Sequence, residues 1–125
     1  MVLQVIPGGF TVCKVQDGAL LPLDKPFCFT ARTDTEFSLM CRTQDVPAQT
    51  LTREDGWRAL RVAGQLDFSL VGILAAIAGV LAEAHISIFA LSTFDTDYVL
   101  TREADFARAL DALRAAGYTT EEVDA

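Results

Sequence analysis

Two aspartates lie two residues apart in the run Ser92-Thr93-Phe94-Asp95-Thr96-Asp97. A pair of carboxylates beside the hydroxyls of Ser92 and Thr93 can bind an ammonium or guanidinium group through charge-assisted hydrogen bonds. Aspartate is also common in turns, because its side chain accepts hydrogen bonds from nearby backbone N–H groups. Asp95 and Asp97 therefore indicate either a cation-binding turn or a purely structural one.

A second group of candidates precedes an apolar stretch whose residues recur at helical spacing, namely Leu70, Ile73, Leu74, Ile77 and Leu81. We expect Asp67 or Ser69 at the start of this helix. The first N–H groups of a helix are unpaired and favour an anion, so they suit the carboxylate of an amino acid. Asp67 and Ser69 can equally act as plain helix caps without a ligand.

The residues that most enzymes and metal sites need do not form a set in this sequence. His85 is the only histidine and falls at a helix-to-strand corner, where a positive φ is tolerated. Cys13, Cys28 and Cys41 are odd in number, widely spaced and in apolar surroundings, which is typical of buried structural thiols. We therefore expect no metal, no cofactor and no catalytic activity.

The composition limits the possible partners. The chain has 125 residues, is 51% hydrophobic and carries a formal charge of −7. Nucleic acids and anionic membranes bind clustered basic residues, which this acidic chain lacks. The longest nearly uncharged run, residues 68–82, is too short to cross a bilayer and predicts a buried helix. Without a targeting signal, we expect a cytoplasmic protein.

The second half of the chain has clear periodicity. It predicts strands at 56–62, 86–92 and 98–101, a first helix ending near His85, and a second amphipathic helix that Gly117 stops. The apolar face of the second helix is formed by Phe106, Leu110 and Leu113. The order β-α-β-β-α predicts an α+β fold in which both helices pack on one face of an antiparallel sheet.

The first half predicts strands at 2–6, 10–15, 27–32 and 37–41, with Pro7-Gly8-Gly9 as a turn. Asp34-Thr35-Glu36-Phe37-Ser38-Leu39 aligns with Asp95-Thr96-Asp97-Tyr98-Val99-Leu100. From Val62 to Asp95 the chain is longer than from Val15 to Asp34 by about the length of one helix. We therefore expect the loop at 18–23 to replace the first helix in the first half. With a boundary in the polar stretch 50–56, the halves are residues 1–54 and 55–125.

The runs at 57–64, 66–74 and 86–97 resemble one family closely, and pieces of the first half fit it as well. It is the family of small bacterial tandem ACT-domain proteins, whose domains are related to the CASTOR-type arginine sensors. The resemblance implies two ferredoxin-like ACT halves, side by side in one sheet, and a free amino acid bound at an ACT–ACT interface. It places the ligand against a loop that faces the turn at 92–97; the loop residues are Leu66, Asp67, Phe68, Ser69, Gly72 and Ile73, and the turn contributes Ser92, Thr93, Phe94, Asp95 and Asp97.

Gly72, Ala76 and Gly79 form a stripe of small residues along the predicted first helix. Such a stripe indicates either close packing on the chain's own sheet or a helix pair in a homodimer. The sequence thus favours a non-catalytic sensor of a free amino acid. The alternative is a structural ACT module that only oligomerises or docks on another protein, which a mean hydropathy of +0.31 also suits.

Overall fold

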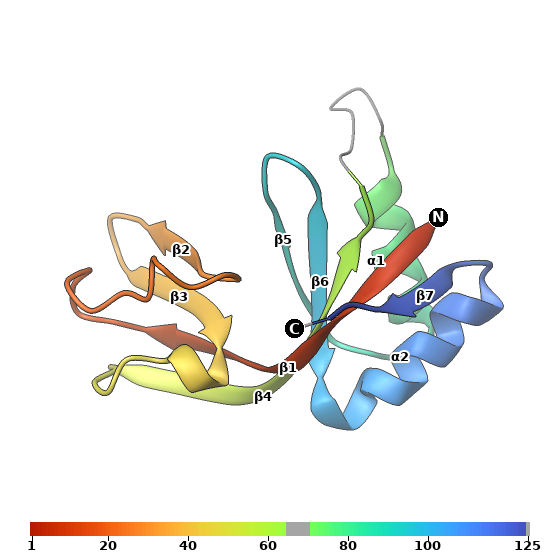
Figure 1. Ribbon diagram of the computed structural model, residues 1–125. Coiled ribbons are helices and arrows are strands. Elements are labelled where there is room, and N and C mark those ends of the chain that lie inside the picture. Colours follow the sequence, from red (N-terminus) through yellow and green to blue (C-terminus); the bar gives the residue numbers. More distant parts are fainter. Residues whose placement is uncertain (65–70, 125) are drawn as a thin grey trace. The chain divides into compact units, whose positions relative to one another are not determined.

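The computed structural model describes residues 1–64 and 71–124, and the elements in them form an α+β fold. Figure 1 labels these elements along the chain. In chain order they are β1 (Val2–Lys14), β2 (Phe29–Arg32), β3 (Phe37–Arg42), the 3₁₀ turn η1 (Thr43–Asp45), β4 (Thr52–Val62), α1 (Ile73–Glu83), β5 (Ile88–Ser92), β6 (Asp97–Arg102), α2 (Glu103–Ala115) and β7 (Thr119–Glu122). Among the described residues, no helix is long and apolar enough to cross a membrane.

The chain forms two compact units, and β1 and β4 contribute residues to both. Unit 1 comprises Met1–Pro7 and Arg58–Ala125, and unit 2 comprises Gly8–Trp57. The first residues of the chain therefore belong with its second half, although the duplication boundary at 54/55 stays a prediction. The predicted turn at Pro7-Gly8-Gly9 is wrong, because β1 continues through it. Gly8 accommodates the strand there with a φ of 88°, which few other residues adopt.

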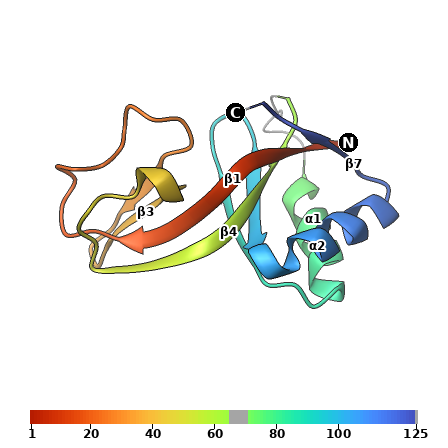
Figure 2. The same cartoon turned by 60° about the horizontal axis from the view of Figure 1, so that its bottom comes forward.

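In unit 1 the strand order is β1-β4-β6-β5, and β7 pairs with β1. β5 and β6 form an antiparallel hairpin in which Ser92 is opposite Asp97. β7 is parallel to β1, with Val2 opposite Thr119 (Figure 2). The sequence does not predict β7, because Thr119–Glu122 has no apolar alternation.

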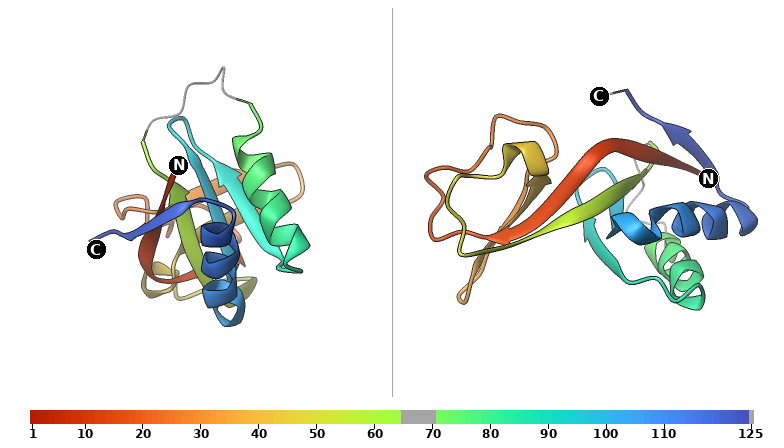
Figure 3. Two further views of the ribbon diagram at one scale, coloured as in Figure 1. Left: turned by 90° about the vertical axis from the view of Figure 1, so that its right-hand side faces the viewer. Right: turned by 90° about the horizontal axis from the view of Figure 1, so that it is seen from below.

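Both helices pack on one face of the unit 1 sheet, as predicted (Figure 3). α1 contributes Ile77 and Leu81 to the core, and α2 contributes Phe106, Ala109 and Leu113. These side chains contact inward-facing strand residues, which are Leu3, Val5, Leu60, Val62 and Val99.

Each helix ends in a Schellman motif, the pair of hydrogen bonds that closes many helices. After α1, His85 N donates to Ala82 O at 3.0 Å and Ile86 N donates to Leu81 O at 3.0 Å. His85 has a φ of 58°, so the predicted positive φ is confirmed. Gly117, with a φ of 102°, ends α2 in the same way and confirms the predicted stop.

Unit 2 has the strand order β2-β3-β1-β4 and no long helix. β3 is antiparallel to both β1 and β2, with Thr11 opposite Cys41. Its core cluster consists of Cys13, Val15, Leu39 and Cys41. Residues 15–28, which connect β1 to β2, contain neither helix nor strand, so the predicted replacement of the first helix by a loop is confirmed.

Candidate functional site

The turn between β5 and β6 carries most of the described candidate residues (Figure 1). Thr93 closes it: its N–H donates to Thr96 O at 2.8 Å, and its hydroxyl donates to the same oxygen at 3.2 Å. Phe94 and Asp95 form the tip, and 73% of the Phe94 side chain is exposed. The turn therefore presents an aromatic ring and a carboxylate to the surroundings of unit 1.

The two carboxylates of the turn differ in their hydrogen bonding. Asp97 accepts a hydrogen bond from the Ser92 hydroxyl at 2.5 Å across the end of the hairpin. Asp95 is exposed, and no donor among residues 1–64 and 71–124 bonds its side chain. Of the predicted pair, Asp97 takes part in closing the hairpin and Asp95 retains its full capacity to accept hydrogen bonds.

Thr96 anchors the turn to the rest of unit 1. Its side chain is buried, and its hydroxyl donates to Val62 O at the end of β4 over 2.7 Å. This bond holds the turn against the end of β4. Thr96 is not among the predicted site residues, because a threonine between two aspartates gives no sign of being buried.

The loop before α1 is described only in part. Leu66, Asp67, Phe68 and Ser69 lie outside the described residues, so their predicted places at the site are untested. α1 begins at Ile73, and its cap position is occupied by Gly72 with a φ of 78°. The helix therefore begins further along the chain than the sequence predicted, and the capping role expected of Asp67 or Ser69 lies outside the described residues.

The first turn of the chain, between β2 and β3, has the same local geometry as the second. Thr33 N donates to Glu36 O at 2.9 Å, and the Thr33 hydroxyl accepts from Glu36 N at 3.1 Å. Arg32 is opposite Phe37 there, as Ser92 is opposite Asp97 in the second turn. The structurally equivalent residues are thus Thr33 with Thr93, and Glu36 with Thr96.

This equivalence differs by one residue from the alignment made on the acidic residues. Asp34 corresponds in structure to Phe94, and not to Asp95. The alignment of the two turns through Asp34 and Asp95 is therefore wrong in register, because the threonine that closes each turn sets the geometry. The acidic pair of the second turn has no structural counterpart in the first.

The small-residue stripe of α1 points away from the unit's own core. Gly72, Ala76 and Gly79 are exposed. A Cβ atom added at Gly79 would meet no atom within 4 Å among the described residues. The alternative in which this stripe serves close packing on the chain's own sheet is therefore wrong.

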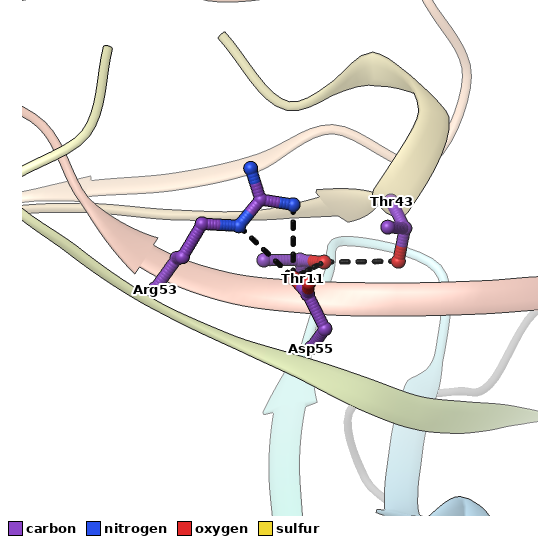
Figure 4. Close-up of polar contacts among 4 residues, drawn as sticks. All are labelled: Thr11, Thr43, Arg53 and Asp55. Atoms are coloured by element: carbon purple, nitrogen blue, oxygen red, sulfur yellow. Dashed lines mark hydrogen bonds and ion pairs between the residues drawn. The ribbon is translucent and has the colours of Figure 1, made fainter. Parts of the chain in front are cut away.

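Unit 2 contains a polar cluster that the sequence does not predict (Figure 4). Asp55 Oδ1 accepts from the buried Thr11 hydroxyl at 2.6 Å and from Arg53 Nε and Nη2 at 3.1 and 3.0 Å. Thr11 and Thr43 share a further hydrogen bond of 2.9 Å. The bond from Thr11, followed by those from Arg53, lowers the pKa of Asp55. Because this oxygen already has three donors, the cluster is structural.

The three cysteines meet in the core of unit 2 although they are far apart in the sequence. Cys13 and Cys41 are buried, and Cys28 packs against them, so the predicted structural role is confirmed for the first two. Burial raises the pKa of the Cys41 thiol to about 12 and also raises the pKa of Cys13 and Cys28. These thiols are therefore protonated at neutral pH and are poor nucleophiles. Within residues 1–64 and 71–124, no cluster of three or more His, Cys, Asp or Glu side chains could hold a metal ion.

Residues 52–115, which run from β4 through α2, match the family described as ACT domain. The chain belongs to the ACT domain family. With it, the predicted α+β fold of ferredoxin-like ACT halves is confirmed. The matched range includes the β5–β6 turn and the start of α1, so the candidate site lies within the ACT domain.

Two kinds of relatives are similar to this chain. The protein of Homo sapiens named cytosolic arginine sensor for mTORC1 subunit 1 is 42% identical over 67 residues, which are 51% of this chain and 20% of that protein. The chain thus matches only one fifth of the length of this relative. Protein Atu0741 from Agobacterium tumefaciens has a crystal structure that superposes with a TM-score of 0.86 at 26% identity, covering 99% of this chain and 94% of that one.

One part of an aspartate kinase from Clostridium acetobutylicum has a similar fold. Its crystal structure superposes with a TM-score of 0.64 at 14% identity, covering 91% of this chain and 33% of the kinase. At this identity the similarity concerns the fold alone.

Proposed function

We propose that this chain is a non-catalytic regulatory module that binds a free amino acid, with the β5–β6 turn forming one side of the site. The observation that carries the proposal is Asp95, an exposed carboxylate without a donor among the described residues, on a turn that Thr96 anchors to β4. A carboxylate held in place in this way suits the ammonium or guanidinium group of a ligand. Asp97 and Ser92 support its position from the end of the hairpin.

The rest of the site comes from the segment before α1. Leu66, Asp67, Phe68, Ser69, Gly72 and Ile73 would face the turn, and another ACT unit would complete the site from outside. The first backbone N–H groups of α1 follow Gly72 and can donate to the carboxylate of the ligand. The ligand would act as a signal by binding one arrangement of the ACT units more tightly than another.

Arginine is the first ligand to test. The human relative is named as a cytosolic arginine sensor, and its similar segment is as long as one ACT domain. The guanidinium and ammonium groups of arginine both suit the carboxylates of the turn. We also propose a cytoplasmic location and a small-molecule ligand for this chain, and the name of this relative supports both.

Isothermal calorimetry and thermal unfolding with each of the twenty amino acids test this function. A ligand at 100 times its dissociation constant should stabilise the protein by about 2.7 kcal/mol. Only one amino acid or a small group of similar ones should produce this effect. If none of the twenty releases heat or raises the unfolding temperature, the proposed function is wrong.

Asp95→Asn tests the position of the site. This variant should bind the identified amino acid at least tenfold more weakly, while its unfolding temperature without ligand stays unchanged, because Asp95 is exposed. Asp34→Asn, at the tip of the first turn, is the matched control and should bind normally. Equal affinity of both variants would move the site away from the β5–β6 turn.

A second candidate function is supported by the outward face of α1. Ala75, Ala76, Gly79 and Ala82 are exposed and uncharged, which leaves a smooth surface on which a second helix could pack. In this case the chain is a homodimer or a docking module without a ligand. Light scattering would then show a tight dimer that Ala76→Glu dissociates, together with no response in the amino-acid screen.

A further inference from the structure

A cavity of about 480 Å³ lies in unit 2, next to the end of β1. Three segments line it, residues 15–17, residues 20–21 and residues 47–51. We propose that this cavity binds a small molecule with an apolar body and a protonated amine. The proposal concerns a site separate from the β5–β6 turn and is independent of the function proposed for that turn.

The cavity lies between the segment that follows β1 and the segment that precedes β4. Leu51 N, directly before β4, donates to Lys14 O at the end of β1 over 2.8 Å. Beyond it, Val15 N donates to Phe37 O at the start of β3, and residues 47–50 contain neither helix nor strand. Within unit 2, residues 18–23 next to the opening form a loop and not a helix. Its volume lies within the range of about 300–1,000 Å³ that is usual for small-molecule sites.

One part of the cavity wall is apolar, and four side chains form it. Leu21 and Val15 line it from the side of the unit's core, and Leu20 and Leu51 form part of its rim. The rim leucines remain 65% and 62% exposed, although leucine side chains gain free energy when they are removed from water. A ligand with an aliphatic or aromatic body would cover them.

The charged side chain in the cavity lining favours a cationic ligand. Asp17 is the only charged residue among those that line it, and the other polar side chains are the neutral Gln16, Gln49 and Thr50. An anionic ligand would meet this carboxylate without a lysine or arginine in the lining to balance it. A protonated amine would instead form a charge-assisted hydrogen bond with Asp17.

Asp17 is held in position by its own loop. Its Oδ1 accepts from Ala19 N at 2.8 Å, which fixes the direction of the carboxylate. In the part of the chain that the structure describes, Asp17 has no ion pair with a lysine or arginine. A carboxylate offers about four acceptor positions on two oxygens, so Oδ2 remains available for an ammonium group.

NMR titration of the ¹⁵N-labelled full chain tests the proposal with two probes that differ only in an amine. L-Leucinamide is a cation with an aliphatic body, and 4-methylpentanamide has the same body without the amine. L-Leucinamide should give saturable shifts at the amides of residues 15–21 and 48–51, and should bind at least tenfold more tightly than 4-methylpentanamide. No saturable shift in these segments, or equal affinity for the two probes, would overturn the proposal.

Three variants identify the contacts. Asp17→Asn keeps an acceptor for Ala19 N but removes the charge, so it should lower the affinity for L-leucinamide at least tenfold. Ala48→Trp should fill the cavity and abolish binding. Asp24→Asn, an exposed carboxylate outside the lining, is the matched control and should bind as the wild type does. Spectra without ligand report whether each variant is folded.

These results also separate the two sites. Shifts at residues 92–97 with an amino acid report the site proposed in unit 1, and shifts at residues 15–21 report the cavity of unit 2. If L-leucinamide shifts only residues 92–97, the proposed cavity site is wrong while the regulatory function still stands.

Discussion

The two hairpin turns of this protein have the same backbone geometry but different attachments. In each, a threonine closes the turn through its N–H and its hydroxyl, Thr33 in unit 2 and Thr93 in unit 1. Only the second turn is tied to a neighbouring strand by a buried side chain, since Thr96 bonds Val62 O whereas Glu36 is exposed. A common local structure therefore does not imply a common role.

The surroundings of the turns differ in the same way. The second turn belongs to a unit whose helices fill one face of the sheet, and the first belongs to a unit in which a loop replaces the helix. The anchored turn is suited to hold a carboxylate in a defined position. The unit without the helix has an open cavity instead.

The largest expected effect comes from the element that one unit has and the other lacks. Leu81→Ala removes a fully buried side chain of α1 and should lower the free energy of unfolding by about 2–5 kcal/mol. Leu20→Ala, in the loop that replaces the helix in unit 2, should change it by less than about 0.5 kcal/mol, because Leu20 is largely exposed. Urea unfolding followed by circular dichroism measures both. A large loss for Leu20→Ala would mean that the loop is a core element like α1.

The second prediction concerns the anchor. Thr96→Val keeps the shape of the side chain but leaves Val62 O without its buried donor, which should cost about 1–3 kcal/mol. Glu36→Val, at the equivalent position of the first turn, should change stability by less than about 0.5 kcal/mol. Chemical denaturation of both variants gives the comparison. Equal losses would show that the first turn has an anchor as strong as the second.

The third prediction tests what the turns share. Thr33→Ala and Thr93→Ala each remove a hydroxyl that bonds the backbone across the turn, so each should cost about 0.5–1.5 kcal/mol. Thr33→Ser and Thr93→Ser keep the hydroxyl and should restore most of the loss. A loss in only one turn would contradict the equivalence of Thr33 and Thr93.

The smallest effect concerns acid stability. The pKa of Asp55 is lowered from its ordinary value of 3.8, so its contribution to folding is present above that value and is lost as the pH falls through the lower folded pKa. Asp55→Asn should therefore be less stable than the wild type at about pH 6, and the difference should shrink at about pH 2. Urea midpoints at both pH values measure this. The surface variant Asp24→Asn should follow the wild type throughout, and a constant difference for Asp55→Asn would contradict the pKa argument.

The sequence predicted most of the fold because apolar spacing reports directly on burial. The helical repeat that includes Ile77 and Leu81 predicts α1, and the alternation around Leu60 predicts part of β4. β7 was missed because its four polar residues pair through the backbone, which leaves no pattern in the side chains. The turn predicted at Gly8 is instead part of β1, since a glycine with a positive φ lets a strand continue as well as end.

The candidate site was less accessible to prediction. The sequence alignment of the two turns was based on their acidic residues, Asp34 and Asp95. The register of the repeat depends instead on the residue that closes each turn, which is Thr93 in the second turn. Thr96 was missed because its importance arises from the proximity of β4, which local sequence does not reveal. The cavity beside Asp17 could not be predicted either, because it is formed by residues 15–21 together with residues 47–51, which are distant in the chain.

Because β1 and β4 contribute residues to both units, the protein cannot be divided into its units by a single cut in the chain. Unit 1 begins with Met1–Pro7 and resumes at Arg58, so along the chain unit 2 is an insertion within unit 1. A fragment that starts at residue 55 would lack Leu3 and Val5 from its core and should misfold or aggregate. Excising residues 8–57 and joining Pro7 to Arg58, which lie on neighbouring strands, should instead yield a minimal autonomous domain. The sequence predicts two consecutive halves, whereas the two compact units are arranged along the chain so that unit 2 interrupts unit 1.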